Sequence, residues 1–570
     1  MTQEETFKNL IAHSKEYGFI FPSSEIYDGL SAVYDYGQMG VEMKNNIKKY
    51  WWEAMVHLND NIVGIDSAIF MHPRIWEASG HVGAFNDPLI DNKDSKKRYR
   101  ADVLLEDYLA KLEEKMNKEV EKGRRKFGEA FNEEQFRATN PNILRVKTKY
   151  DEVHERMAKA LNANALQELR QIIVDCEIAC PISGTKNWTE VRQFNLMFST
   201  QLGNISDEAG TIYLRPETAQ GIFVNYLNVQ KTGRMEIPIS GTRNWTEVRQ
   251  FNLMFKTEMG STADGASTIY LRPETAQGIF VNYLNVQKTG RMKIPFGIAQ
   301  IGKAFRNEIV ARQFIFRMRE FEQMEMQFFI KPGTELDWFA KWKQTRMAWH
   351  QNLGFGAENY RFHDHEKLAH YANAATDIEF KMPFGFKEVE GIHSRTNFDL
   401  SQHEKFSGKS IKYFDPEMNE SYTPYVIETS IGVDRMFLSI MCHSYQEEQL
   451  PDGETRVVLR LPAALAPIKL AVMPLTKKDG LPEKAREIID DLKFHFNCQY
   501  DEKDSIGKRY RRQDAIGTPY CVTIDHQSLE DGTATIRFRD TMEQERVKIA
   551  DLRQIIEDKV TITSLLKNLK

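Results

Sequence analysis

The chain has 570 residues, 41% of them hydrophobic and 28% charged, and a net charge of −5 at pH 7. This length exceeds what one compact core accommodates, so two or three domains are expected. The composition excludes a disordered chain, no apolar run is long enough to span a bilayer, and the net charge does not by itself favour a nucleic-acid partner. The polar N-terminus lacks the apolar core of a secretory signal, so a cytoplasmic location is expected.

The five cysteines are few, scattered and odd in number, which disfavours a disulfide framework. Cys176 and Cys180 have a spacing that suggests half of a zinc knuckle. No second Cys or His pair lies at a suitable distance, and position 183 is a serine. We therefore expect no zinc site.

The first half of the chain is mainly helical in pattern. Residues 41–58 carry apolar side chains at helical spacing. From about residue 104 to 175 the composition shifts to Lys, Glu, Leu and Ala, with an apolar stripe, a breaker at 140–142 and a second helical run. These features predict a helical hairpin inserted into another domain.

From about residue 190 to 445 aromatic and β-forming residues predict strands, with helices at 336–353 and 367–375. Residues 453–467 are typical of a linker. Strands then alternate with helices, which predicts a small α/β domain. The expected segments are 1–103 as the first part of a large domain, 104–175 as the helical insertion, 176–450 as the core of the large domain, and 466–570 as the C-terminal domain.

A tandem duplication is the most unusual feature of the sequence. Residues 181–237 and 238–294 align without a gap at an offset of 57 and differ at 10 positions. Two copies are too few for a solenoid. The second copy connects to residues 296–329 by the shorter loop, so we expect it to supply the sheet strand and Glu274 to reach the site. The first copy, with Glu217, is then expected to lie outside the sheet; the reverse assignment is the alternative.

Residues 296–329 read as a strand, a loop and a second strand. On the second strand, period-two alternation places Arg319, Gln323 and Glu325 on one face and Met324 and Met326 on the other. A row of Arg, Gln and Glu aimed at a cavity can bind an anion at one end and an ammonium group at the other. Such a strand is therefore a candidate for a ligand-binding site.

The second candidate segment is Glu428-Thr429-Ser430-Ile431-Gly432-Val433-Asp434-Arg435, followed by an apolar helix. Glycine lets a planar ligand approach the backbone. An arginine at that position can cover an aromatic face or bind a phosphate.

Together, these segments resemble motifs 2 and 3 of class II aminoacyl-tRNA synthetases, and most closely the glycyl family. VYDYGQMGVEMKNNIKKYWW, RPETAQGIF, FRNE, FRMREFEQMEMQFF and ETSIGVDR occur in the family's order. GKRYRRQDAIGTP resembles its anticodon-binding domain. The sequence departs from the family pattern at Gln38, Asn397 and Ala515, where Pro, Asp and Glu are usual.

The resemblance implies an α+β fold: an antiparallel sheet flanked by helices, a helical insertion and a C-terminal α/β anticodon-binding domain. It implies ATP-dependent formation of glycyl-adenylate and transfer of the glycyl group to tRNA. ATP, Mg²⁺, glycine and tRNA are the implied ligands, and the motif 1 region implies a homodimer. The alternatives are a catalytically impaired relative that binds nucleic acid or regulates, and a class II enzyme for another small amino acid.

The resemblance also assigns residues. ATP would be bound by Arg306, Asn307, Glu308, Phe316, Arg317, Met318, Arg319, Glu320, Phe321, Glu388, Val389, Gly432, Val433, Asp434 and Arg435. Glycine would be bound by Arg100, Glu274, Phe321, Glu322, Gln323, Met324, Glu325, Glu428, Thr429, Ser430, Ile431 and Gly432. Arg306, Arg319 and Arg435 are the expected catalytic residues, and Glu388 is expected to carry Mg²⁺ with ATP.

Overall fold

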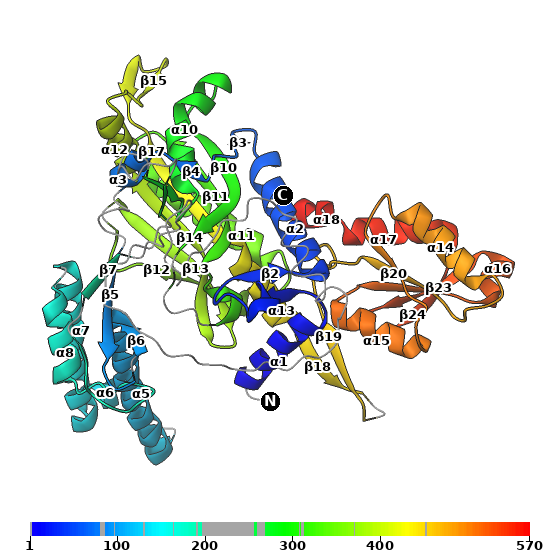
Figure 1. Cartoon of the computed structure of the whole chain (residues 1–570), viewed down its shortest axis with the longest axis horizontal. Coiled ribbons are helices and arrows are strands. Elements are labelled where there is room, and N and C mark those ends of the chain that lie inside the picture. The colour runs from blue at the N-terminus through cyan, green and yellow to red at the C-terminus, as the bar shows by residue number, and fades with distance from the viewer. Residues whose placement is uncertain are drawn as a thin grey trace. The chain divides into compact units, whose positions relative to one another are not determined.

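The structure is a computed structural model, and it describes residues 3–79, 86–95, 97–128, 131–163, 165–189, 192–195, 256–258, 268–306, 308, 313–369, 371–450 and 453–569 (Figure 1). These residues fall into two compact units. The first holds residues 3–79, 257–258 and 268–569, and the second holds residues 86–195 and Lys256. The two units are described separately.

A seven-stranded sheet is the centre of the first unit. Its strands, in spatial order, are β12 (Tyr360–Asp364), β13 (Ala374–Met382), β14 (Gly385–Thr396), β17 (Tyr425–Gly432), β11 (Glu320–Ile330), β10 (Phe296–Phe305) and β3 (Ile62–Gly64). Every neighbouring pair is antiparallel except β3 and β10. The antiparallel sheet expected from the sequence is therefore confirmed, with one parallel strand at its edge.

One face of this sheet is apolar because every second residue of its strands is hydrophobic. Met324, Met326 and Phe328 of β11 are almost fully buried there. They share a core with residues of three helices, α2 (Gln38–Trp52), α11 (Glu335–Gln351) and α13 (Val433–Ser444). A separate apolar cluster joins α10 (Ala276–Thr289) and α12 (Phe398–Ser407) to the strands. The polar face of the central strands remains for the site.

Smaller elements complete the first part of this unit. They are α1 (Gln3–Glu16), β1 (Ile20–Pro22), β2 (Tyr34–Tyr36), a π-helical turn (Glu53–His57), β4 (Phe70–Met71), α3 (Pro73–Ala78), β8 (Lys256–Glu258), β9 (Thr268–Leu271), η5 (Phe314–Phe316), β15 (Tyr413–Asp415), β16 (Glu420–Tyr422), β18 (Tyr445–Gln449) and β19 (Thr455–Leu459). β4 pairs with β9, which is a strand of the second copy of the duplication.

The C-terminal residues form an α/β domain with a five-stranded sheet. The strands are β21 (Cys498–Tyr500), β20 (Leu470–Pro474), β22 (Tyr520–Ile524), β23 (Thr533–Phe538) and β24 (Gln544–Lys548), in that spatial order. The helices are α14 (Leu481–Leu492), α15 (Ile506–Ile516), α16 (His526–Asp531), α17 (Leu552–Val560) and α18 (Ile562–Lys567). The alternation of strands and helices predicted for this region is confirmed.

The second unit contains the long helices predicted between residues 104 and 175. They are α5 (Ala101–Phe127), α6 (Glu133–Thr139), α7 (Pro141–Asn162) and α8 (Leu166–Asp175), beside a sheet of β6 (Lys97–Arg100), β5 (Asn86–Asn92) and β7 (Arg192–Asn195). The predicted breaker starts a new helix instead of a loop. Asn140 caps α7 by accepting from the backbone N–H groups of residues 142 and 143, and Pro141 occupies the first turn.

Two local predictions were wrong. Residues 367–375 form no helix among those that the structure describes; residue 374 instead begins β13, whose pairing with β14 overrides a weak helical pattern. Residues 453–467 are not only a linker, because β19 lies within them and pairs with β18. In both cases a partner strand from another part of the chain decides the structure. Of the helices in the described ranges, none has the length and apolar character needed to cross a membrane.

Candidate active site

The polar face of the large sheet gathers side chains from four strands. The register places Gln300, Glu325 and Ser430 side by side on β10, β11 and β17. In the next row, Gln327 and Glu428 are partners, and His393 of β14 lies opposite Glu428. The alternation predicted for β11 is present, and its polar side chains meet those of β17.

Two buried carboxyl groups from these adjacent rows lie close to each other. Glu325 is 2% exposed and Glu428 is 5% exposed. The Gln327 amide bridges them, with Nε2 donating to Glu325 Oε1 at 2.8 Å and to Glu428 Oε2 at 2.7 Å. The Thr275 hydroxyl also donates to Glu325. Glu274, which precedes this threonine, accepts a 3.0 Å hydrogen bond from Gln277.

The two carboxyl groups differ in protonation. Burial, together with the charges of Glu428 and Glu274, raises the pKa of Glu325 well above its usual range. Burial acts the same way on Glu428, but the charge of Arg395 and a hydrogen bond with His393 outweigh it and lower its pKa. One neutral and one ionised carboxyl group therefore stand next to each other, an arrangement that offers one full negative charge to a small cation.

Several residues assigned to the amino-acid pocket lie on the other face of the sheet. Glu322 pairs with Lys44 at 3.2 Å and Lys48 at 3.1 Å. Met324 and Ile431 are in the apolar core, and Thr429 is 1% exposed and registered with a core methionine. Because strand side chains alternate, only the backbone of these residues can contribute to the site.

Glu388 reaches the site face through a β-bulge. Neighbouring residues 378 and 379 of β13 pair with residues 390 and 388 of β14, so β14 has one extra residue, Val389, at this point. Glu388 therefore joins Arg435, with Nη1 to Oε2 at 2.9 Å, whereas Glu390 points to the opposite face. Val389 is buried in the core. The Arg435 charge lowers the pKa of Glu388.

Two of the predicted arginines lie against aromatic rings. The Arg306 guanidinium is 5.2 Å from the centre of the Phe321 ring, and its Nε donates to the Pro273 carbonyl at 3.1 Å. Arg435 lies 4.5 Å from the Phe316 ring centre. The charges of both arginines act on Glu388. The structure thus brings Arg306, Arg435 and Glu388 together.

Arg319 has a different environment. Its Nε donates to the Glu308 carbonyl at 3.1 Å and its Nη1 to the Ser31 carbonyl at 2.9 Å. Burial lowers the pKa of Arg319. This side chain ties two loops together beside the start of β11.

The remaining residues of the loop and strand end are placed as follows. Arg317 lies 3.9 Å from a Glu308 carboxylate oxygen, Glu320 pairs with Lys303 at 2.8 Å, and Met318 is buried. Asn307 lies outside the described residues. Arg100 belongs to the second unit, where it forms a two-pronged pair with Asp102 at 3.2 and 2.6 Å.

The start of α13 orients Arg435. Asp434 is 2% exposed and uses both carboxylate oxygens within the protein, accepting from Lys44 at 2.7 Å, from the Tyr36 hydroxyl and from the Glu322 backbone N–H at 2.9 Å. It anchors the helix to α2 and β11 instead of facing the site. Val433 is buried beside it.

Gly302 of β10 and Gly432 of β17 carry no side chain on the site face of the sheet. A β-carbon added at Gly432 would meet nothing nearer than Arg435 Cγ, at 3.6 Å. At Gly302 the corresponding space is filled by Arg272, whose Nη2 lies 2.2 Å from that position. Gly302, Gln323 and Gly432 form one row across three strands. The open part of this row can receive a planar ligand.

The sequence interpretation missed Arg395 and Gln277, which contact the predicted carboxylates Glu428 and Glu274, and Asp399, which contacts both Arg395 and Gln277. Arg395 donates to Glu428 at 3.0 and 3.2 Å and to Asp399 at 2.8 and 3.0 Å. The available signal was the four-residue spacing of the arginine and the aspartate after a strand. That spacing is common, so it did not single them out.

The two copies of the duplication contribute different parts. Residues 181–189 of the first copy are described in the second unit, where Trp188 is buried and donates to the Ile178 carbonyl. Residues 268–294 of the second copy are described in the first unit, with Arg272 Nε donating to the Lys303 carbonyl at 2.7 Å. Glu217 lies outside the described residues. The first copy was expected to be extruded and partly ordered, and its described residues, 181–189 and 192–195, belong to the second unit. The second copy was expected to supply a strand of the large sheet, but its strand β9 pairs with β4 in a separate three-stranded sheet.

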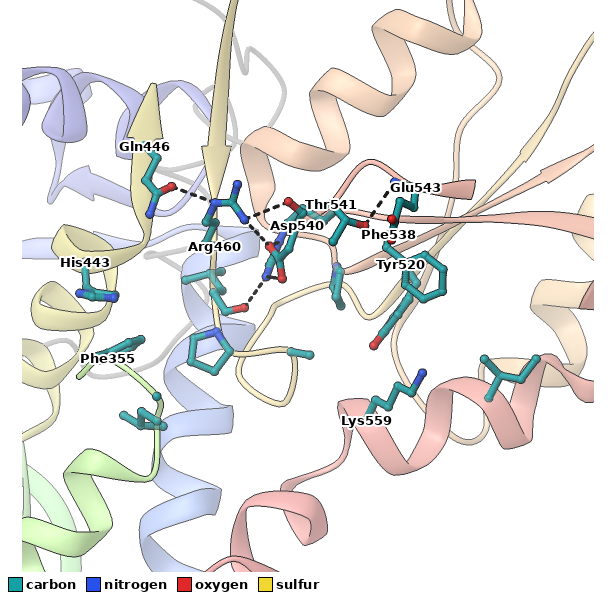
Figure 2. A pocket seen from close by; sticks show the side chains of 18 of the residues that line it. Phe355, His443, Gln446, Arg460, Tyr520, Phe538, Asp540, Thr541, Glu543 and Lys559 are labelled. Atoms are coloured by element: carbon teal, nitrogen blue, oxygen red, sulfur yellow. Dashed lines mark hydrogen bonds and ion pairs between the residues drawn. The ribbon is translucent and has the colours of Figure 1, made fainter. Parts of the chain in front are cut away.

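A cavity of about 850 Å³ lies elsewhere in the first unit, between the β18–β19 hairpin and the C-terminal domain (Figure 2). No predicted site residue lines it. Its Arg460 already donates to Gln446 at 2.8 Å and to the Asp540 carbonyl at 3.0 Å, as Figure 2 shows. The polar face of the sheet is therefore the better candidate for chemistry.

Comparison with known families agrees with this geometry. Residues 255–445 match the class II tRNA synthetase core domain (G, H, P, S and T), residues 87–196 match glycyl-tRNA synthetase insertion domain 1, and residues 469–559 match an anticodon-binding domain. The chain is 47% identical to a glycine–tRNA ligase of Chlorobaculum tepidum over 97% of its own length and 99% of that protein. The chain belongs to the glycine–tRNA ligase family.

Further members of this family give similar values. The ligase of Staphylococcus haemolyticus is 45% identical, with 97% of this chain and 98% of that protein covered. The ligase of Geobacillus thermodenitrificans is also 45% identical at the same coverage. The predicted family and fold class are therefore confirmed.

Proposed function

We infer that the chain is a ligase of the aminoacyl-tRNA kind that activates glycine with ATP and transfers the glycyl group to tRNA. Its curated relatives carry the name glycine–tRNA ligase over nearly their whole length. The observation that carries this function is the pairing, on one sheet face, of a buried acidic pocket with a cluster of arginines. Nothing favours the impaired-relative alternative, because Arg306 and Arg435 are both present at the site.

The arginines support the following roles. Arg306 would neutralise the α-phosphate, where negative charge gathers when the glycine carboxylate attacks. Arg435 would exchange its contact with Glu388 for the γ-phosphate or the adenine end of ATP. Phe321 would stack on the adenine, and Glu308 would accept from its amino group. Arg319 would hold the loop that presents Glu308.

Mg²⁺ fits the donors at this end of the site if it arrives with the nucleotide. Glu388 offers one carboxylate, with a side chain 47% exposed, and no group of three or more metal-ligating side chains occurs in the described ranges. Mg²⁺ commonly binds through one or two carboxylates and substrate phosphates. When bound, it would stabilise the leaving pyrophosphate.

The acidic pocket would hold glycine. Glu428 and Glu274 supply negative charge for the ammonium group, and Glu325 and Ser430 supply further polar contacts. Since a single methyl group changes binding by only about 1–3 kcal/mol in a merely apolar pocket, crowding must exclude larger side chains. Arg100 remains the proposed partner of the glycine carboxylate.

The wider assignments are also proposals. The C-terminal α/β domain would bind the anticodon of tRNA, and the motif 1 region around α2 would form a homodimer. The proposed segments are 1–103, 104–175, 176–450 and 466–570, and the proposed location is the cytoplasm.

The function is tested by ATP–pyrophosphate exchange and by charging of tRNA. Exchange should depend on glycine and be absent with alanine, serine or threonine. Absence of exchange with glycine in folded protein would contradict the proposed function. Exchange with another small amino acid in place of glycine would instead identify a class II enzyme of different specificity.

A further inference from the structure

A second layer of charged residues lies behind the acidic pocket. Arg395 is the last residue but one of β14, and Asp399 lies in the first turn of α12. The Arg395 guanidinium forms a fork with Asp399, at 2.8 and 3.0 Å, and uses its Nη1 on both oxygens of Glu428, at 3.2 and 3.0 Å. Its flat face lies 4.0 Å from the centre of the Tyr371 ring. Arg395 is only 5% exposed, so water does not compete for these contacts.

This layer connects four elements of the fold. Asp399 Oδ1 accepts from Gln277 Nε2 of α10 at 3.1 Å, and the same amide nitrogen donates to Glu274 at 3.0 Å. The Gln277 oxygen pairs with His403 Nε2 of α12 at 2.8 Å. Glu274 and Glu428 are therefore held, through Gln277, Asp399 and Arg395, by one continuous hydrogen-bonded network. A network satisfied in this way fixes the positions of its members.

The charges of the network leave one negative charge uncompensated. Arg395 contacts two carboxylates, Asp399 and Glu428, and one guanidinium offsets only one of them. The groups that face Glu428 and Glu325 from the neighbouring elements are Glu274, Arg272, Gln327, Tyr371, His393, Arg395 and Asp399. An ammonium group bound beside Glu428 would supply the positive charge that these two carboxylates lack.

We propose that Arg395 is a positioning residue of the amino-acid pocket: it holds Glu428 in place as the acceptor of the substrate ammonium group, while Gln327 bridges Glu428 to Glu325. This inference rests on the proposed function, because it requires an amino acid in the pocket. The Arg395 guanidinium is occupied by Asp399 and Glu428, so it acts through Glu428 and not on the substrate. Lysine cannot replace it fully, since one ammonium group cannot reproduce the two-pronged contacts.

The first test is Arg395→Met, assayed by ATP–pyrophosphate exchange with glycine. The loss of charge-assisted hydrogen bonds to Glu428 should raise KM for glycine roughly 10- to 100-fold, with KM for ATP changed less than about twofold. Without the guanidinium, burial raises the pKa of Glu428, so KM for glycine should rise as the pH falls below about 7. In the wild type, Glu428 stays ionised over that range. Arg395→Lys should restore part of the affinity and of the flat pH profile.

A matched control separates this role from folding. Arg346→Met removes another buried arginine, 2% exposed and paired with Glu390 of the same strand on the opposite face. It should lower the thermal unfolding midpoint without changing KM for glycine or its pH profile. If Arg395→Met does not fold, Arg395→Lys gives the same comparison at smaller amplitude. Equal glycine KM and pH profile in wild type and a folded Arg395 variant would overturn the inference.

Calorimetry with two inert adenylate analogues tests the contact itself. Glycyl-sulfamoyl adenosine carries the ammonium group, and its deamino acetyl counterpart does not. Arg395→Lys should weaken binding of the glycyl analogue and leave the acetyl analogue unchanged within about twofold. Equal weakening of both would mean that Arg395 contacts the acyl or nucleotide part, which overturns the proposal. If wild-type protein shows no glycine-dependent exchange, the proposed function fails instead.

Discussion

The two faces of the large sheet use the same residue types for different purposes, and β14 shows both uses. Glu390 points to the apolar face, where it meets Arg346 at 2.6 Å and His350 at 2.7 Å, with all three side chains at most 2% exposed. Glu388, two residues earlier, meets Arg435 at 2.9 Å on the site face, where the side chains are 47% and 25% exposed. The bulge between them separates the buried Glu390–Arg346 pair from the exposed Glu388–Arg435 pair.

The difference is in how completely each charge is satisfied. On the apolar face, Glu390 has two partners that are permanent parts of the fold. On the site face, Arg435 and Glu388 can separate at little cost because water and ligand phosphates replace the contact. Of these two pairs on β14, the one that can open is thus exposed, and the one that stays closed is buried.

The largest effect is expected from Glu390→Gln. This change leaves the Arg346 guanidinium buried without its carboxylate, which should reduce the free energy of unfolding by about 3–5 kcal/mol. Thermal unfolding should show a clearly lower midpoint, while KM for ATP and glycine in the folded fraction stay close to wild type. An unfolding midpoint of Glu390→Gln equal to that of wild type would contradict the stabilising role assigned to the pair on the apolar face.

Arg435→Ala is the matched change on the other face. Loss of a phosphate-binding arginine should lower kcat/KM for ATP in the exchange reaction by about 10²–10³, or roughly 3–4 kcal/mol of transition-state stabilisation. The unfolding midpoint should hardly move, because exposed ion pairs contribute about 0–1 kcal/mol. Full activity in this variant would show that Arg435 does not contact the nucleotide.

Two glycines of one row sharpen the comparison further. Gly302→Ala should destabilise the fold by about 1–3 kcal/mol, since its β-carbon would overlap the Arg272 guanidinium. At Gly432 an added β-carbon has room, so Gly432→Ala should leave the free energy of unfolding within about 0.5 kcal/mol of wild type. The added methyl group should raise KM for ATP, because it takes up space where the planar ligand would lie. Thermal unfolding and exchange assays on both variants check this; the opposite ranking of stabilities would contradict it.

The smallest effect concerns pH. Burial, only partly opposed by Glu390, lowers the pKa of His350 from its ordinary value of 6.5. The stability contributed by the neutral imidazole is present above that value and is lost as the pH falls below it, by up to about 1.4 kcal/mol per pH unit. Unfolding midpoints of wild type and His350→Gln between pH 7.5 and 5.5 should converge on acidification. A wild type that gains stability in acid would disprove the assignment.

Much of the arginine cluster and of the fold was predictable from local sequence. The alternation on β11 separates Glu325 from Met324, and a glycine followed by an arginine at the start of α13 marks Gly432 and Arg435. Such patterns repeat over two to four residues, and strand and helix geometry converts them directly into faces. The same reasoning failed at residues 367–375, where pairing with a distant strand outweighed the local pattern.

The sequence by itself determined the family, the order of the motifs and which residues of β11 share a face, because these depend on neighbours along the chain. Only the tertiary structure decided that Asp434 anchors to Lys44, that a bulge turns Glu388 toward Arg435, and that Arg395 lies behind Glu428. These contacts join residues tens to hundreds of positions apart. Their energies come from burial and from the registers of paired strands, which no local pattern specifies.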